Sequence, residues 1–285
     1  MKISKRIWNF RNEIIRCTPK FPNNRETVSI MQEHSLGNLL IHYLNWAIRY
    51  VATRPRAVTV EPAVTSDVRW KYLRHSIRLL LSKVNAGENL TPYLSRQTHS
   101  RGYSPTASQS GTELDRWADK DFLLNAMGFH HFHLGEKRDI SGQVERTDDL
   151  LFAKVDRKNF LAIGIFDHSV FDFSETDMST ERTRLWQIFE RHMSRGFSSG
   201  TVLALPPITT SGHTVHVVKT AQQYARIVRE LDSKLDDSNF INELYDSVQF
   251  NPPTRPRFQW NLNFSDLVLH EQSLNHHFMI QRGFN

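Results

Sequence analysis

Side chains that could cleave a phosphodiester lie close together in the middle of the chain. They are His131, His133, Arg146, Lys154 and His168. Histidine exchanges protons near neutral pH and can act as a general base or a general acid. Arginine and lysine can hold a phosphate and stabilise the charge that develops on its oxygens. These residue types together can supply what RNA cleavage without a metal ion requires.

Two other interpretations of the same histidines remain open. His131 and His133 form a His-x-His pair, which is a frequent arrangement of metal ligands on a strand, and His168 and Glu136 could complete such a site. No regular ligand signature surrounds the pair, and we expect no metal. In the third interpretation the histidines only occupy a half-buried strand, where backbone or solvent satisfies their ring nitrogens. The chain also has no glycine-rich phosphate loop and no dinucleotide fingerprint, so we expect no cofactor.

Short strand-like segments must position these side chains. They comprise residues 129–134, 146–156 and 159–168, with polar turns between them. Because alternate residues of a strand share a face, we expect His131 and His133 to point the same way. Lys154 shares a face with Phe152 on the second segment. His168 follows the third segment, at a loop edge where a side chain is held by the scaffold but still reaches solvent.

This part of the chain, about residues 115–172, resembles the RelE/ParE-type toxin superfamily, the small ribonucleases of bacterial toxin–antitoxin pairs. The matching pieces are His131-Phe-His133, Arg146 with Leu150-Leu-Phe-Ala-Lys-Val-Asp156, and Ile163-Gly-Ile-Phe-Asp-His168 with Phe171. The resemblance implies that Arg146 holds the phosphate and that His168 is the acid or base. His131 and His133 stand where family members often keep basic residues. The resemblance also implies an RNA substrate, in many members on the ribosome, and a neutralising antitoxin-like partner.

The rest of the chain predicts an α+β fold with an N-terminal helical region, a small central antiparallel sheet of RelE/ParE-like type and a C-terminal α/β extension. The expected regions are helical residues 1–87, a linker at 88–112, the core at 113–195 and the extension at 196–285. Apolar spacing predicts helices over residues 35–51, 67–84, 113–127, 180–193 and 220–235. Strands are expected over residues 201–205, 213–218, 258–262, 267–269 and 278–280.

The net charge and the cysteine content indicate which binding partners and which cellular compartment we expect. The formal net charge of +6 favours a polyanionic partner such as nucleic acid, and we expect Arg69, Arg74, Arg78 and Arg101 to contact it. A basic stripe on a helix is, however, more often only its solvated side. The single cysteine, Cys17, rules out an internal disulfide and fits a cytoplasmic location. No apolar stretch is long enough to span a bilayer, so no membrane partner is expected.

Our leading hypothesis is a toxin-like, metal-independent endoribonuclease that cleaves mRNA in a toxin–antitoxin or phage-defence system. One alternative is a non-catalytic nucleic-acid-binding or regulatory protein, which the net charge favours. Another alternative is a structural or assembly protein in which the histidines serve only packing.

Overall fold

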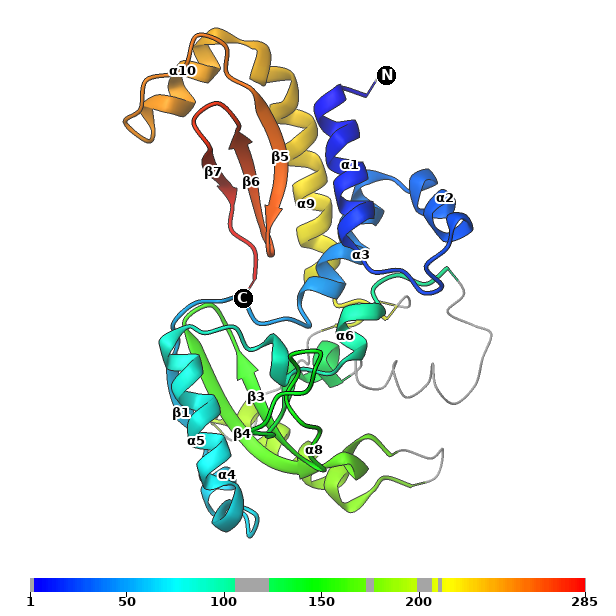
Figure 1. Cartoon of the computed structure of the whole chain (residues 1–285), viewed down its shortest axis with the longest axis vertical. Helices are drawn as coiled ribbons and strands as arrows, with labels where there is room; N and C mark the ends of the chain where they lie inside the picture. The colour runs from blue at the N-terminus through cyan, green and yellow to red at the C-terminus, as the bar shows by residue number, and fades with distance from the viewer. Residues whose placement is uncertain (1–2, 106–122, 173–176, 199–206, 210–211, 285) are drawn as a thin grey trace. The chain divides into compact units, whose positions relative to one another are not determined.

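The computed structural model describes residues 3–105, 123–172, 177–198, 207–209 and 212–284 (Figure 1). The chain divides into two compact units. The terminal unit combines residues 1–48, 100–105 and 216–284, and the central unit contains residues 49–99 and 106–215. Both units combine helices with a β-sheet, which confirms the predicted α+β class. None of the described helices is long and apolar enough to cross a membrane.

The central unit is built on a four-stranded sheet of order β1-β4-β3-β2. Its strands are β1 (Ala57–Val60), β2 (Phe129–His133), β3 (Asp149–Val155) and β4 (Asn159–Asp167). The strands β2, β3 and β4 form an antiparallel meander, as the sequence predicts. β1 pairs parallel with β4, with Ala57 opposite Asn159, so the sheet is mixed rather than antiparallel. This fourth strand comes from a region that we expected to be helical.

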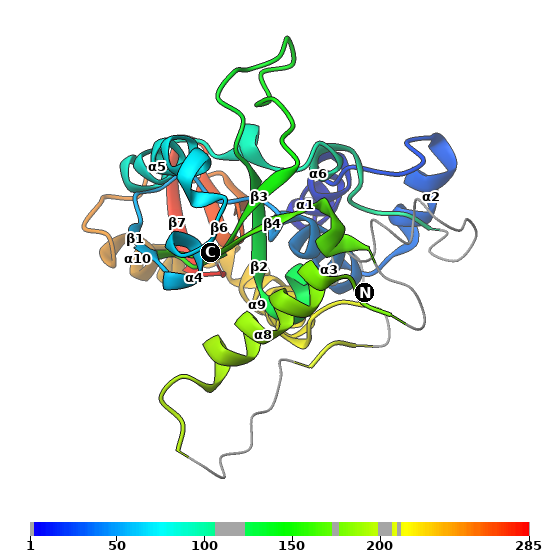
Figure 2. The same ribbon diagram turned by 90° about the horizontal axis from the view of Figure 1, so that it is seen from below.

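Helices cover both faces of this sheet (Figure 2). The elements are α4 (Pro62–Thr65), α5 (Trp70–Ala86), η1 (Thr91–Tyr93), α6 (Gln97–Ser100), η2 (His168–Phe171) and α8 (Thr180–Ser194). The apolar side of α5 packs with Phe132, Leu151 and Phe160 on one face. On the other face, α8 packs its Leu185 and Phe189 against the sheet. The central unit therefore has three layers, and each face of the sheet has its own hydrophobic core.

The helix predicted over residues 67–84 is confirmed as α5, which ends where expected. Gly87 caps it in the left-handed conformation with φ of 73°. A Cβ atom at this position would lie 2.5 Å from the backbone nitrogen of Pro55. Only glycine fits both constraints without strain, so Gly87 fixes where the chain leaves the helix.

The terminal unit places its helices against a three-stranded antiparallel sheet of order β5-β6-β7. Its elements are α1 (Lys5–Cys17), α2 (Arg25–Glu33), α3 (Leu36–Ala47), α9 (Val215–Asp232), η3 (Ser233–Asp236), α10 (Ser238–Asp246), β5 (Phe258–Asn263), β6 (Asp266–Glu271) and β7 (His276–Gln281). The predicted C-terminal strands and the helix after Ser35 are confirmed, and the Ser35 hydroxyl caps α3 by accepting from the Asn38 amide. The strand predicted over residues 213–218 is wrong, because α9 begins there and has a single buried side.

The division into units differs from the regions predicted by composition. The first 87 residues do not form one helical region, because residues 1–48 join the C-terminal part of the chain. The expected extension is divided as well, at residue 216. Of the helix predicted over residues 113–127, only residues 123–127 are described, and they are helical. The strand predicted over residues 201–205 lies outside the described residues.

Candidate active site

The face of the sheet covered by α8 carries a cluster of histidines. Strand β2 alternates as expected, so His131 and His133 share the face of Phe129, which lies in the core beneath α8. The His133 side chain is almost entirely buried, at 2% exposure. Its ring lies 5.7 Å from the ring of His168, with the two planes inclined by only 28°. The sheet therefore brings together two histidines that are far apart in sequence.

His168 occupies the first position of η2, directly after β4. The Asp167 carboxylate starts this turn by accepting a hydrogen bond from the Ser169 amide at 2.9 Å. The His168 Nδ1 atom lies 3.0 Å from the carbonyl oxygen of Asp148. Because a carbonyl oxygen can only accept, we assign the ring proton to Nδ1. In the neutral ring Nε2 is then the basic nitrogen, which suits a general base at a partly exposed position.

Aromatic rings surround the third histidine of this cluster. The His131 ring lies 5.1 Å from the ring of Phe171, 5.8 Å from that of Phe152 and 6.5 Å from that of His133. His131 is half-buried, so it remains closer to solvent than His133. We refer to His131, His133 and His168 as the histidine cluster.

Lys154 lies at the opposite end of the sheet. It is paired with Phe129, whereas Asp149, at the other end of β3, is paired with Asp167 beside His168. Five residues of strand separate these two ends, which amounts to roughly 17 Å. The Lys154 Nζ atom instead lies 3.4 Å from Nε2 of His192 on α8. The structure therefore does not bring Lys154 to the histidine cluster.

Arg146 lies in the loop between β2 and β3, which also supplies Asp148. The pKa of its guanidinium is lowered by desolvation and by the nearby charge of Arg96. The next residue, Thr147, ties the loop to the sheet, because its hydroxyl accepts from the Leu134 amide at 3.0 Å. Within the described residues, no hydrogen bond or ion pair joins the Arg146 side chain to His168.

A second group of titratable side chains surrounds His192 at the Lys154 end of the sheet. Glu61 accepts two hydrogen bonds from Arg195, at 2.8 and 2.7 Å, beside a cavity of about 100 Å³ that His192 also lines. Burial lowers the pKa of His192, Lys154 and Arg195 lower it further, and Glu61 opposes them. The sequence analysis missed this group because Glu61 and His192 are far apart in the chain and belong to no motif.

An ion network lies next to the histidine cluster and engages Arg69. The Arg69 guanidinium contacts Asp67 at 2.9 Å and Glu181 at 3.2 Å. It also lies 3.6 Å from Asp167, and only 14% of its side chain is exposed. Arg184 adds a contact of 3.0 Å to Asp67. Burial disfavours the charge of Arg69, but the hydrogen bonds to Asp67 and Glu181 outweigh it and raise the pKa.

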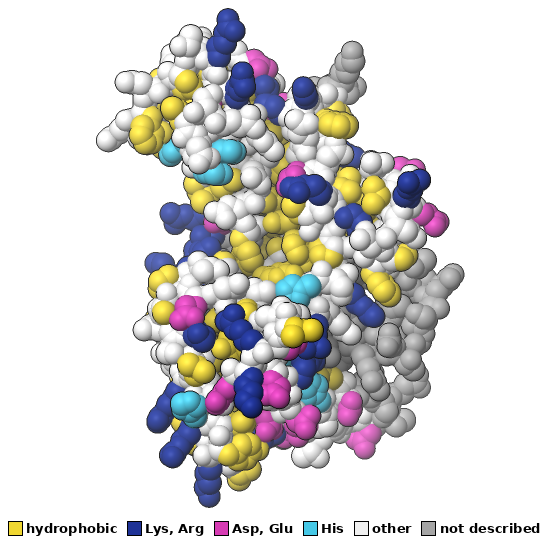
Figure 3. All heavy atoms as spheres, viewed as in Figure 1, with side chains coloured by type: hydrophobic (Ala, Val, Ile, Leu, Met, Phe, Trp, Pro, Cys, Tyr) yellow, Lys and Arg dark blue, Asp and Glu magenta, His cyan; other side chains and the backbone are white. Residues whose placement is uncertain are grey.

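The other cations predicted to bind nucleic acid have different surroundings. Arg74 and Arg78 are exposed on α5, and Arg78 lies over the ring of Trp70 at 6.0 Å. Arg101 belongs to the terminal unit, where it lies 4.5 Å from the centre of the Phe21 ring. In Figure 3, acidic and basic side chains are interspersed over the lower part of the visible face.

The metal interpretation needs Glu136 near the histidines, but Glu136 lies elsewhere. Its carboxylate accepts a hydrogen bond from the Ser76 hydroxyl at 2.8 Å, on the α5 side of the sheet. In the parts of the chain that the structure describes, no group of three or more His, Cys, Asp or Glu side chains is arranged to hold a metal ion.

A buried arginine on α8 was not anticipated from the sequence. Arg182 is 5% exposed and belongs to the buried side of α8, together with Leu185 and Phe189. That side covers the sheet face on which the histidine cluster lies. The signal available in the sequence is its spacing from Leu185 and Phe189, because residues three and four positions apart share one side of a helix.

Comparisons with protein-family models, with curated proteins and with solved structures found no match to this chain.

Proposed function

We propose that the central unit is a metal-independent endoribonuclease whose active site is the histidine cluster. The observation that carries this proposal is the close pairing of the His133 and His168 rings, at 5.7 Å. In the cluster, His133 packs between the rings of His168 and His131, and these two less buried imidazoles can divide the work of base and acid that cleavage by the RNA 2′-hydroxyl requires.

The surroundings of each ring suggest its role. Nε2 of His168 takes the proton of the 2′-hydroxyl, since Nδ1 is engaged with the Asp148 carbonyl. The 2′-oxygen then attacks phosphorus, and the bond to the 5′-oxygen breaks. His131 in its protonated form gives a proton to that leaving oxygen, because it is less buried than His133. The products are a 2′,3′-cyclic phosphate and a free 5′-hydroxyl.

The resemblance to RelE/ParE-type toxins supports the biological setting that we propose. In this setting the protein cleaves mRNA in a toxin–antitoxin or phage-defence system, and a neutralising partner keeps it silent. The resemblance assigns the phosphate to Arg146, which lies on the same loop as Asp148, the carbonyl partner of His168. Movement of this exposed side chain toward the cluster on RNA binding is part of the proposal.

The decisive experiment measures RNA cleavage by purified wild-type protein beside His168→Ala. A labelled single-stranded RNA is incubated with each protein in the presence of excess EDTA, and the product ends are identified. We expect cleavage by the wild type with cyclic phosphate ends, and a loss of about 10²-fold or more in His168→Ala. Inducible expression of both proteins in bacteria should give growth arrest and RNA loss with the wild type alone.

RNA binding without cleavage is the second candidate function. It is favoured by the exposed cations Lys71, Arg74 and Arg78 along α5. This candidate predicts binding that weakens steeply with salt and no cleavage by either protein. Equal cleavage by wild type and His168→Ala would mean that the active site lies elsewhere, and the proposed role of the histidine cluster would then be abandoned.

A further inference from the structure

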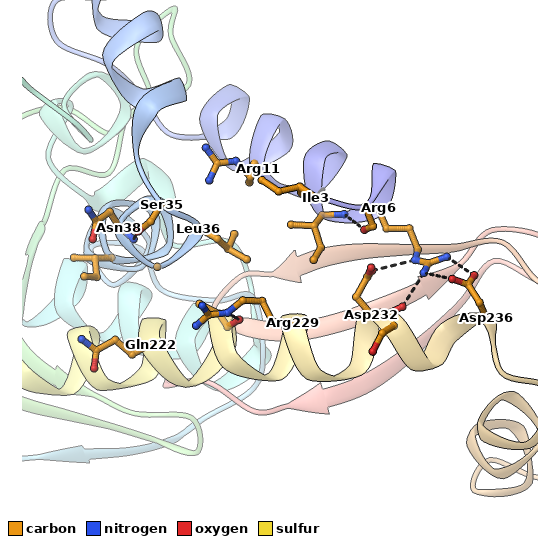
Figure 4. A pocket seen from close by; sticks show the side chains of 16 residues that line it. Ile3, Arg6, Arg11, Ser35, Leu36, Asn38, Gln222, Arg229, Asp232 and Asp236 are labelled. Carbon is orange, nitrogen blue, oxygen red and sulfur yellow. Dashed lines mark hydrogen bonds and ion pairs between the residues drawn. The ribbon is translucent and has the colours of Figure 1, made fainter. Parts of the chain in front are cut away.

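The terminal unit contains a groove of about 700 Å³ between α1, α3 and α9 (Figure 4). Its lining includes the apolar side chains of Ile3, Ile7, Leu36 and Ile41. Pockets of 300–1,000 Å³ with apolar walls and few polar groups are typical of small-molecule sites. This groove lies within the terminal unit and shares no residue with the histidine cluster.

Small residues keep this groove open. Gly37 on α3 and Ala225 on α9 both line it. A Cβ atom built on Gly37 would lie 3.9 Å from the Ala225 Cβ, which is an ordinary contact. Alanine therefore fits at position 37, whereas a large side chain there would occupy space that is now open. This difference supplies a matched pair of variants.

An ion bridge crosses one end of the groove. Arg6 donates to Asp232 at 3.0 Å and to Asp236 at 2.9 Å, as Figure 4 shows. The Asp232 carboxylate also accepts from the indole nitrogen of Trp260 at 2.8 Å. One guanidinium offsets only one of these two carboxylates, so this end of the groove remains net negative and an anionic head group would avoid it.

Two further arginines line the groove from opposite walls. Arg11 of α1 donates to the Gln32 carbonyl at 2.9 Å, and Arg229 of α9 donates to the Ala225 carbonyl at 2.9 Å. Over the described ranges, neither arginine forms an ion pair with a carboxylate. Each guanidinium has five N–H donors, so most of its hydrogen-bonding capacity remains for a ligand. Figure 4 shows both arginines further along the groove than the Arg6 bridge.

We propose that this groove binds a single-chain amphiphile, with its apolar chain along the isoleucines and its anionic head at Arg11 and Arg229. Arginine recognises carboxylate and phosphate groups by paired hydrogen bonds, so the head is a carboxylate or a monophosphate. A cationic head would meet the unneutralised charge of Arg11 and Arg229. A neutral chain would bury apolar area but leave both guanidinium groups without an anion.

Calorimetric titration of the full chain tests this proposal with four dodecyl probes kept below their micelle concentrations. The probes are dodecanoate, dodecyl phosphate, dodecanol and dodecyltrimethylammonium. We expect the two anionic probes to bind at least about tenfold more tightly than the others, since only they can form charge-assisted hydrogen bonds with the arginines. The comparison between dodecanoate and dodecyl phosphate identifies which anionic head the site prefers.

Matched variants locate the binding. Gly37→Trp should abolish it, and Gly37→Ala should retain it. Arg229→Ala should weaken it by about tenfold, whereas Arg226→Ala, on the same helix but outside the lining, should not. Circular dichroism checks the fold of each variant, and Arg11→Ala tests the site independently if Gly37→Trp fails to fold.

Equal binding of all four probes would overturn the proposal, because the arginines would then recognise no head group. Binding that survives Gly37→Trp in a folded protein would also overturn it, since the ligand would lie elsewhere. An absence of binding by both anionic probes would have the same consequence.

Discussion

The two ends of the central sheet hold histidines in contrasting settings. At one end, His133 and His168 stack on each other, and a carbonyl oxygen fixes the tautomer of His168. At the other end, His192 lies beside the cation of Lys154 and close to an ion pair between Glu61 and Arg195. The first setting places two rings face to face and fixes one tautomer, whereas the second disfavours a protonated ring.

The difference arises from strand register. Lys154 and His168 are close in number, but Lys154 lies in β3 and His168 directly follows β4. In the sheet, however, Asp149 pairs with Asp167 next to His168, while Lys154 is paired with Phe129 at the far end. Lys154 therefore lies near the turn that joins β3 to β4, and the length of β4 separates it from His168.

The largest expected effect is on the rate of RNA cleavage, which should differ between variants at the two ends of the central sheet. His133→Gln should reduce RNA cleavage by about 10²-fold, because the ring that stacks on His168 and positions it is lost. His192→Gln should leave the rate within a few-fold, because that ring lies at the other end of the sheet. Cleavage of the labelled RNA under the conditions used for His168→Ala measures both.

His133 is buried, so its replacement must be distinguished from unfolding. Circular dichroism and hydrogen exchange of β2 and β3 provide that control. A folded His133→Gln protein with wild-type activity would remove the ring pair from the mechanism. Loss of activity in His192→Gln alone would transfer the active site to the other end.

Stability should also distinguish the two ends. Arg69→Met leaves Asp67 and Glu181 with Arg184 as their remaining cation, at a site where the Asp67 side chain is only 4% exposed. We expect a loss of about 3 kcal/mol, the order measured when one member of a buried ion pair is removed. Arg195→Met removes a side chain that is 59% exposed, and we expect a much smaller loss, because solvent screens an exposed ion pair.

Hydrogen exchange of β3 and β4 peptides is the suitable measurement, because it reports the free energy of opening in the central unit alone. Similar losses for the two arginine variants would mean that the network around Arg69 is no more important than a surface pair. Lys83→Met on α5, which removes an ion pair with Glu88 just beyond the end of that helix, serves as a further control.

Local signals in the sequence predict much of this fold. The turn after α5 was indicated by Gly87, the start of α3 by Ser35, and the meander β2-β3-β4 by alternating apolar residues. The parallel pairing of β1 with β4 was not predicted, because β1 has four residues and its partner lies far along the chain. Nor does any local pattern reveal that residues 1–48 pack with residues 216–284.

The candidate site, too, could be predicted from the sequence only in part. Alternation in β2 correctly indicates that His131 and His133 share a face, and the ring contacts with His168 follow from pairing of β2 and β4 to β3. The ion network around Arg69 could not be predicted, because its carboxylates come from separate segments. A charged residue before a helix gives no indication in the sequence of whether it faces solvent or an ion pair.

A smaller effect concerns the turn that carries His168. The Ser179 hydroxyl accepts from the Arg182 amide at 3.1 Å and donates to the Ser169 carbonyl at 2.6 Å, so it joins α8 to η2. Ser179→Ala should cost about 1 kcal/mol of local stability. Hydrogen exchange should increase in η2 and the first turn of α8 but not at the Lys154 end of β3. An unchanged η2 would mean that Asp167 alone holds the turn.

The smallest expected effect is a shift in the pKa of His192, which would show that its neighbours control its charge. Burial is the main cause of its lowered pKa, and the positive charge of Lys154 adds to it. Lys154→Met should therefore raise the pKa partway toward 6.5, whereas Glu61→Gln should lower it further, since Glu61 favours the protonated ring.

In the wild type, the folded state binds the His192 proton less readily than the unfolded chain does. Stability therefore decreases as the pH falls through the ordinary histidine range, and Lys154→Met should reduce that decrease. Titration of the ring resonances by NMR measures each pKa, with His213, whose pKa is lowered by its own burial and by Arg49, as an internal reference that should not move. A His192 pKa that moves in neither variant would mean that burial alone sets it, and the contrast between the two ends would then rest on the ring pair of His133 and His168.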